Sequence, residues 1–125
     1  MPITYTTDCE QKLITEVWTG EITAECLAAY WKQYLDDPDV LAIRRTLVDL
    51  RQAEIRFKGA DLDTLIRNIV LPVVEGRDWK TAIVVEKSLQ YGVSRQYQVF
   101  AECYSKDAIF YDLEKARNWL AGLPD

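Results

Sequence analysis

Polar residues at the ends of two apolar segments are the first candidates for chemistry in this chain of 125 residues. Asp49 lies near the end of the apolar segment 46–50, and Arg51 follows that segment directly. In open α/β sheets, functional groups gather at the carboxyl ends of the strands. We therefore expect Asp49 and Arg51 to contact a ligand or a partner. The alternative is that the two side chains pair with each other and stabilise the strand end.

The second candidate follows the apolar segment 81–85, where Lys87 precedes a predicted helix. The unpaired N–H groups of a helix N-terminus attract anions, and Arg95 lies two turns further along the same helix. Tyr91 lies between them, next to Gly92, where close packing or a bound ligand would both explain a glycine. We expect a ligand or partner to contact Lys87, Tyr91 and Arg95, although no glycine-rich phosphate loop precedes them.

The residue types present argue against an enzyme. The chain has no histidine, which excludes Ser-His-Asp catalysis and histidine-based zinc sites. Its three cysteines form no C-x-x-C pair, so they predict neither a metal site nor a redox pair, and they favour a reducing compartment. The paired carboxylates, including Glu10 and Glu16, are interpreted as helix caps and solvated groups. We predict no catalytic residue, no metal and no cofactor.

The charge balance narrows the choice of partners. The chain carries 15 Lys and Arg against 20 Asp and Glu, for a net charge of −5, which argues against nucleic-acid binding. Nine of the cations lie in residues 41–90, as a solvated face or as an anion-binding patch. No apolar run reaches the roughly 18 residues of a membrane span, and the N-terminus lacks a signal-peptide core. We predict a cytoplasmic protein, with peripheral membrane contact left open.

The four tryptophans divide into two groups. Trp18, Trp31 and Trp119 fall at core-facing positions of predicted elements. Trp79 lies next to the polar turn 76–78, and we expect it to be exposed. An exposed tryptophan is a typical anchor of a protein interface, although it can also cover an edge of the core.

Hydrophobic periodicity predicts five strands, at residues 3–7, 13–18, 46–50, 81–85 and 108–111. Four helices alternate with them, beginning near Thr23, Ala60, Ser88 and Asp112, and Pro72 is expected to end or kink the second one near Val70. The order β-β-α-β-α-β-α-β-α predicts an α/β fold with a largely parallel sheet and an antiparallel N-terminal hairpin. The length predicts a single domain over residues 1–125.

Several short strings share a pattern with a known family: residues 20–23 (GEIT), 47–51 (LVDLR), 91–95 (YGVSR) and 110–116 (FYDLEKA). Together with the order of the elements, these strings resemble the SpoIIAA-like family of small bacterial proteins, which is related in fold to STAS domains. The resemblance spans nearly the whole chain. It implies a five-stranded mixed sheet with the helices mainly on one face.

The resemblance also implies a function. STAS domains of the anti-anti-sigma type are not enzymes; they bind a partner kinase, and phosphorylation of a serine at the start of the second helix switches that binding. The segment 57–62 of this chain contains no Ser or Thr, and Asp61 would carry a fixed negative charge there. We therefore expect a non-catalytic interaction or regulatory module, self-associating, without the switch serine.

Proteins of similar fold, including the lipid-carrying CRAL-TRIO group, suggest a second function. They hold apolar ligands beneath movable helices. The alternative for this chain is therefore a small apolar or anionic, lipid-like ligand in a pocket beneath the C-terminal helix. Asp49, Tyr91, Arg95, Tyr97 and Trp119 would lie near such a pocket.

Overall fold

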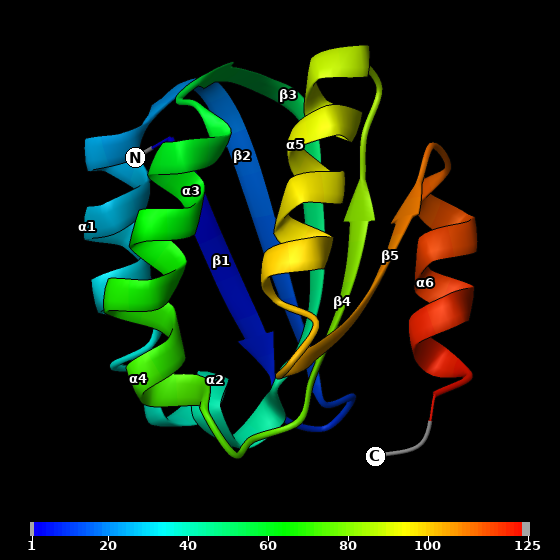
Figure 1. Ribbon diagram of the computed structural model, residues 1–125. Coiled ribbons are helices and arrows are strands. Elements are labelled where there is room, and N and C mark those ends of the chain that lie inside the picture. The colour runs from blue at the N-terminus through cyan, green and yellow to red at the C-terminus, as the bar shows by residue number, and fades with distance from the viewer. Residues whose placement is uncertain (1, 124–125) are drawn as a thin grey trace.

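A computed structural model describes residues 2–123 and shows a five-stranded mixed sheet in the order β1-β2-β3-β4-β5 (Figure 1). The strands are β1 (Ile3–Asp8), β2 (Leu13–Thr23), β3 (Arg45–Arg56), β4 (Trp79–Val84) and β5 (Ser105–Phe110). β1 pairs antiparallel with β2, and the other three pairings are parallel. The predicted α/β class, the five strands and the antiparallel hairpin at one edge are confirmed.

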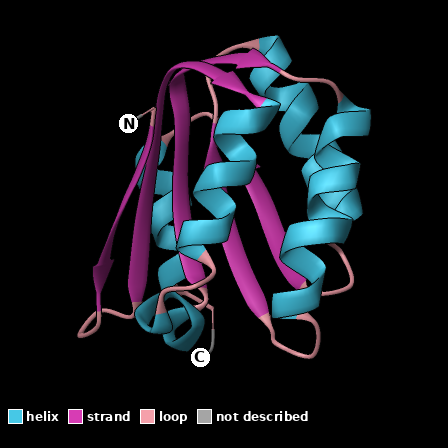
Figure 2. Ribbon diagram, turned by 90° about the vertical axis from the view of Figure 1, so that its left-hand side faces the viewer, coloured by secondary structure: helices cyan, strands magenta, loops and turns pink. Residues whose placement is uncertain are grey.

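The helices form two unequal groups around the sheet. They are α1 (Ala24–Tyr34), α2 (Pro38–Ile43), α3 (Gly59–Leu65), the π-helical turn η1 (Ile66–Val70), α4 (Leu71–Val74), α5 (Ser88–Phe100) and α6 (Leu113–Ala121). The helices α1, α3, α4 and α5 lie in one layer against the sheet, as Figure 2 shows from the side. α6 packs against β3, β4 and β5 through an apolar cluster of its own, on the opposite face.

Local capping explains where several helices begin. The Thr23 hydroxyl accepts a hydrogen bond from the Cys26 amide at 3.1 Å, and the Asp112 carboxylate accepts one from the Glu114 amide at 2.8 Å. Both side chains satisfy N–H groups that have no partner within the helix. The short helix α2 was not predicted; it begins at Pro38, which suits a first turn, and Asp37 caps it through the Asp39 amide.

The second predicted helix is divided into three parts. Its chain passes from α3 through η1 into α4, and Pro72 lies in the first turn of α4. Proline has no amide hydrogen to donate to the preceding turn, so a regular helix cannot continue through it. A π-helical turn absorbs this irregularity, and such turns are frequent at functional sites.

The strands send alternate side chains to the two faces of the sheet. On β3, Thr46, Val48 and Leu50 face the larger helical layer, whereas Leu47 faces α6. On β4, Trp79, Thr81 and Ile83 face the larger layer, whereas Ala82 and Val84 face α6. The molecule therefore has two cores that share one sheet.

No helix within residues 2–123 is both long enough and apolar enough to cross a membrane.

Candidate ligand-binding cavity

A cavity of about 70 Å³ lies between the sheet and the helices α1, α3, α4 and α5. Strands β2, β3 and β4 form its floor, and η1 contributes Val70 to its cover. Seven aromatic side chains line it: Trp18, Trp31, Tyr34, Phe57, Trp79, Tyr97 and Tyr104. Most other lining residues are aliphatic, so the few polar groups among them determine what chemistry the cavity offers.

Glu16 is the ionisable acid in the cavity wall. Its side chain is only 4% exposed, and two donors bind its carboxylate: the Trp18 indole N–H to Oε2 and the Tyr30 hydroxyl to Oε1, both at 2.6 Å. Burial raises the pKa of Glu16, and the two hydrogen bonds oppose that rise. Our interpretation of Glu16 as a solvated group is therefore wrong. The alternation Ile14-x-Glu16-x-Trp18 was the signal for its burial, because it puts Glu16 on the apolar face of the strand.

Trp79 is buried, not exposed. It is 5% exposed, and its indole N–H donates to the Thr46 hydroxyl at 3.3 Å. The same hydroxyl is 2.8 Å from the Tyr34 hydroxyl. The prediction of an exposed anchor was wrong because β4 begins at Trp79 itself, so the strand turns this side chain toward the core while residues 76–78 remain exposed.

A second carboxyl group is buried behind the cavity wall on β5. Burial raises the pKa of Asp107 to about 6, although hydrogen bonds with Ser105 and Thr81 oppose that rise. The Ser105 hydroxyl donates to Asp107 Oδ1 at 2.6 Å. Its other oxygen, Oδ2, is buried and has no hydrogen-bond partner among the residues described. Both Glu16 and Asp107 act on Tyr97: its burial and the two nearby acids raise its pKa. The electrostatics of this region are therefore acidic.

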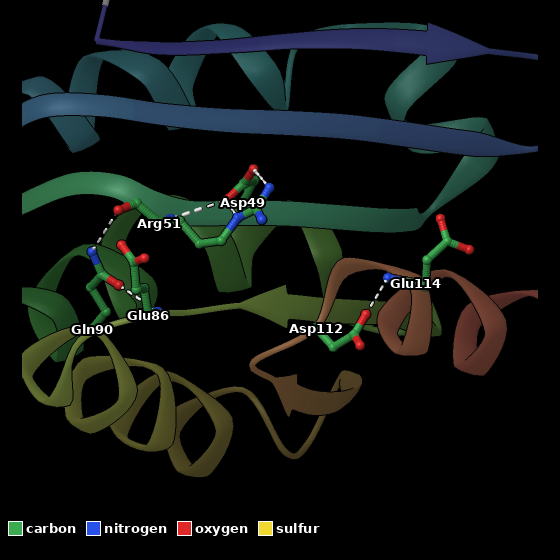
Figure 3. A network of polar contacts seen from close by, with 6 residues as sticks. All are labelled: Asp49, Arg51, Glu86, Gln90, Asp112 and Glu114. Carbon is green, nitrogen blue, oxygen red and sulfur yellow. Dashed lines mark hydrogen bonds and ion pairs between the residues drawn. The ribbon is translucent and has the colours of Figure 1, made fainter.

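The predicted pair of Asp49 and Arg51 lies on the other face of the sheet, near α6, as Figure 3 shows. The Arg51 guanidinium donates to both Asp49 oxygens, at 3.0 and 2.9 Å. Bonding to Arg51 lowers the pKa of Asp49. Gln90 fixes the start of α5 beside this pair, because it donates to the Ala53 carbonyl and accepts from the Glu86 amide. The two residues pair with each other, and a role in ligand contact stays a prediction.

The three candidates at α5 are four residues apart, on one face of the helix, and a role of theirs in ligand or partner contact stays a prediction. Lys87 precedes the helix, and Arg95 donates to Gln98, one turn further along. Tyr91 stacks on Tyr111 with ring centroids 6.0 Å apart, and both rings are exposed. None of Lys87, Tyr91 and Arg95 lines the cavity.

The cavity is not beneath the C-terminal helix. Ala116 and Leu120 of α6 pack directly on Leu47, Ala82 and Val84, and no residue of α6 lines the cavity. Of the five residues expected near such a pocket, only Tyr97 lines the cavity. The small side chains Ala82 and Ala116 on this face let α6 approach the sheet closely.

A second pocket, of about 360 Å³, is lined mainly by positively charged side chains, whereas the ionisable acid of the first cavity is Glu16. Four cations line it, Lys12, Arg44, Arg45 and Lys80, together with Asp78, Cys9, Ala42 and Ile43. It lies at the amino ends of β3 and β4, where the Lys80 amide donates to the Arg44 carbonyl at 3.1 Å. Arg45 also donates to the Leu123 carbonyl at 3.1 Å. Three of the nine cations of residues 41–90 therefore lie together at this pocket.

Within residues 2–123, no cluster of three or more His, Cys, Asp or Glu side chains is arranged to hold a metal ion. Cys9 and Cys103 are exposed, and Cys26 is half-buried. All three are free thiols.

Comparison with known proteins identifies the fold. No protein-family profile matches the chain, and no curated protein matches it. Among solved structures, the chain is similar to an uncharacterised protein of the DUF3478 family with a SpoIIAA-like fold, from Shewanella loihica. The two share 18% identity with a TM-score of 0.62, over 94% of this chain and 93% of that one. The chain has a SpoIIAA-like fold.

Proposed function

We propose that the protein binds a small, mainly apolar molecule in the cavity between the sheet and the larger helical layer. The observation that carries this proposal is Glu16, a buried carboxyl group in an otherwise aromatic and aliphatic wall. Burying an ionisable group costs free energy that an apolar side chain of similar size would not. A buried carboxyl group with a shifted pKa in a cavity is a typical sign of a binding site.

The size of the cavity limits the ligand. Its volume of about 70 Å³ is roughly half that of an engineered cavity that holds benzene, and well below the ~300 Å³ or more of pockets for drug-sized molecules. A lipid chain does not fit unless the cover formed by α3, η1 and α4 moves. We therefore propose a small ligand, or a small head group of a larger one. This replaces the lipid-like ligand beneath the C-terminal helix.

The proposed role is binding without catalysis. Hydrogen bonds from Trp18 and Tyr30 already fix both oxygens of Glu16, so the carboxyl group is held in place more than it is poised as a base. The proposed location is the cytoplasm, as the unpaired cysteines suggest. We propose no nucleic-acid partner, because the net charge of −5 would repel phosphates.

Native mass spectrometry of the freshly purified protein, followed by thermal shift with a panel of small apolar molecules, tests this proposal. Val93→Phe on α5 fills the cavity, and Val99→Phe on the same helix is the matched control, because Val99 is exposed and does not line it. We expect Val93→Phe to abolish ligand binding and Val99→Phe to retain it. A clean apo mass with no thermal shift across the panel would contradict the proposal.

Self-association is the second candidate function, and exposed apolar side chains favour it. Leu89, Tyr91 and Tyr111 are 63%, 39% and 62% exposed, and the two rings stack on each other. Glu86 and Lys87, which have opposite charges, are exposed beside them. In a symmetric contact, this surface would meet the same surface of a second copy, and Glu86 of each copy could pair with Lys87 of the other. Light scattering after size exclusion tests this: we expect a dimer that Tyr111→Ser dissociates, and a monomer at every concentration would contradict it.

A further inference from the structure

We propose that the ligand of the cavity is a small organic cation, such as a methylated ammonium group, held by Glu16 and the surrounding aromatic rings. This inference rests on the proposed function and specifies its ligand. It replaces the anionic ligand that the sequence suggested as an alternative for this protein.

The aromatic lining is the first reason. Seven of the 14 aromatic residues in the chain line this one cavity. The faces of aromatic rings carry partial negative charge, and groups of them recognise quaternary ammonium ions through cation–π interactions. Three of the four tryptophans, the residue type that interacts best with cations, are among the lining residues. An uncharged aliphatic ligand would need no such concentration of rings.

The sign of the charge is the second reason. Glu16 is the ionisable acid in the wall, and no Lys or Arg is among the residues that line the cavity. Asp107, behind the wall, hydrogen-bonds with Thr81, which itself lines the cavity. An anion in this place would meet two buried carboxyl groups without a counter-ion, which is strongly unfavourable. A cation would pair with Glu16 in surroundings of low dielectric, where the interaction is strong.

The geometry of Glu16 is the third reason. An ionised carboxylate has about four lone-pair sites, and the bonds from Trp18 and Tyr30 account for two of them. A bound cation would use the remaining sites. The two donors also keep the carboxylate fixed, which reduces the entropy lost on binding.

A bound cation acts on the protonation equilibrium of Glu16. Burial raises the pKa of Glu16, and a cation, which favours the ionised form, should oppose that rise. The titratable groups that act on Glu16 or share its surroundings are Tyr30 and Tyr34 on α1, Tyr97 on α5, and Tyr104 and Asp107 next to it. Burial raises the pKa of all four tyrosines, so they remain neutral, and the carboxyl groups are the charged groups that a bound cation would meet.

Calorimetric titration with choline and with its uncharged tert-butyl analogue tests the inference, because the two molecules differ in charge and hardly in shape. Both molecules are larger than benzene, so each of them enters the cavity of about 70 Å³ only if the cover formed by α3, η1 and α4 moves. We expect choline to bind at least about tenfold more tightly than the analogue. Glu16→Gln should abolish this preference. Glu21→Gln, on the same strand but with an exposed side chain, is the matched control and should retain it.

The outcomes separate this inference from the proposed function. Equal affinity for both molecules, or binding of small apolar molecules but not of choline, would overturn the inference that the ligand is a cation. The proposal that the cavity binds a ligand would stand. Failure of every ligand would overturn both. If Glu16→Gln does not fold, as judged by circular dichroism, Trp31→Leu replaces it: loss of one ring from the wall should weaken choline severalfold more than the analogue. Equal weakening of the two would count against the cation.

Discussion

The two faces of the sheet are packed in different ways. On the face toward α1, α3, α4 and α5, large aromatic and polar side chains enclose a cavity of about 70 Å³. On the face toward α6, a small aliphatic cluster is buried, and the partly buried rings of Phe110 and Trp119 pack against it; its members are Leu47, Ala82, Val84, Ala116 and Leu120. Both faces are built by alternate residues of the same strands, so the difference arises from side-chain size and from the helices that cover each face.

This difference separates two tasks within one small domain. Small aliphatic side chains fill space closely and gain stability from it. Aromatic side chains are large, and the N–H group of Trp and the O–H group of Tyr can satisfy a buried carboxyl group such as Glu16. We infer that the main role of the α6 face is to stabilise the fold. On the other face, the packing is less complete and encloses a cavity with a buried carboxyl group. The following predictions test this contrast.

The largest effect is expected at the closed face. Leu47→Ala removes a fully buried side chain from beneath α6 and should lower the free energy of unfolding by about 2–5 kcal/mol. Denaturation by urea measures this change. Leu89→Ala, at a position 63% exposed, is the control and should change stability by less than about 0.5 kcal/mol. A small loss at Leu47 would mean that this face is loosely packed.

The cavity side should make stability depend on pH through Asp107. Its pKa rises from 3.8 in the unfolded chain to about 6 in the folded protein, so the folded state holds the proton more tightly. The resulting stabilisation is complete below pH about 4 and is lost as the pH rises through about 6. By linkage it amounts to roughly 3 kcal/mol at most.

Asp107→Asn isolates this contribution, since the amide does not titrate. Urea denaturation of both proteins at several pH values between about 4 and 7 measures the difference between their stabilities, which should change by that amount. A difference that does not vary with pH would show that the Asp107 carboxyl group is not desolvated.

Added volume should have opposite effects on the two faces. Ala82→Val introduces atoms into the closed cluster beneath α6 and should cost about 1–3 kcal/mol. Val48→Ile, on the neighbouring strand, adds one methylene group at the wall of the cavity and should be neutral or stabilise by up to about 1 kcal/mol. Thermal melting of the two variants compares them. The contrast fails if both variants lose the same stability.

The smallest effect is expected for the ion pair between Asp49 and Arg51. The Arg51 side chain is 37% exposed, so solvent screens the pair. A double-mutant cycle with Asp49→Asn and Arg51→Gln should give a coupling energy of about 1 kcal/mol or less. A clearly larger value would mean that this pair holds the end of β3 in place, and that charge as well as aliphatic packing stabilises the α6 face.

Local signals in the sequence were reliable where the cause is local. Thr23 and Asp112 cap helices as predicted, because a cap depends only on the next three residues. Apolar periodicity found all five strands, but β3 extends to Arg56 instead of ending at residue 50. Residues 51–56 alternate polar and buried side chains and pair with β2 beyond a bulge, which only the neighbouring strand reveals.

The candidate site was harder to predict than the fold. Trp79 and Glu16 were both expected in solvent, because one follows a polar turn and the other carries a charge. Their burial depends on strand pairing and on donors distant in sequence: Thr46 lies 33 residues from Trp79, and Tyr30 lies 14 residues from Glu16. Such satisfaction of buried polar groups is a property of the assembled fold.

By itself, the sequence determined the five strands and the starts of four helices, since periodicity and caps act over a few residues. It also excluded histidine chemistry outright. The tertiary structure alone decided which face of the sheet is closed by α6 and which retains a cavity, because that depends on how crossovers return distant helices to the sheet. Glu16 is one of twenty acidic residues in the sequence. Only the packing of distant helices on the sheet places its carboxyl group in the wall of an aromatic cavity.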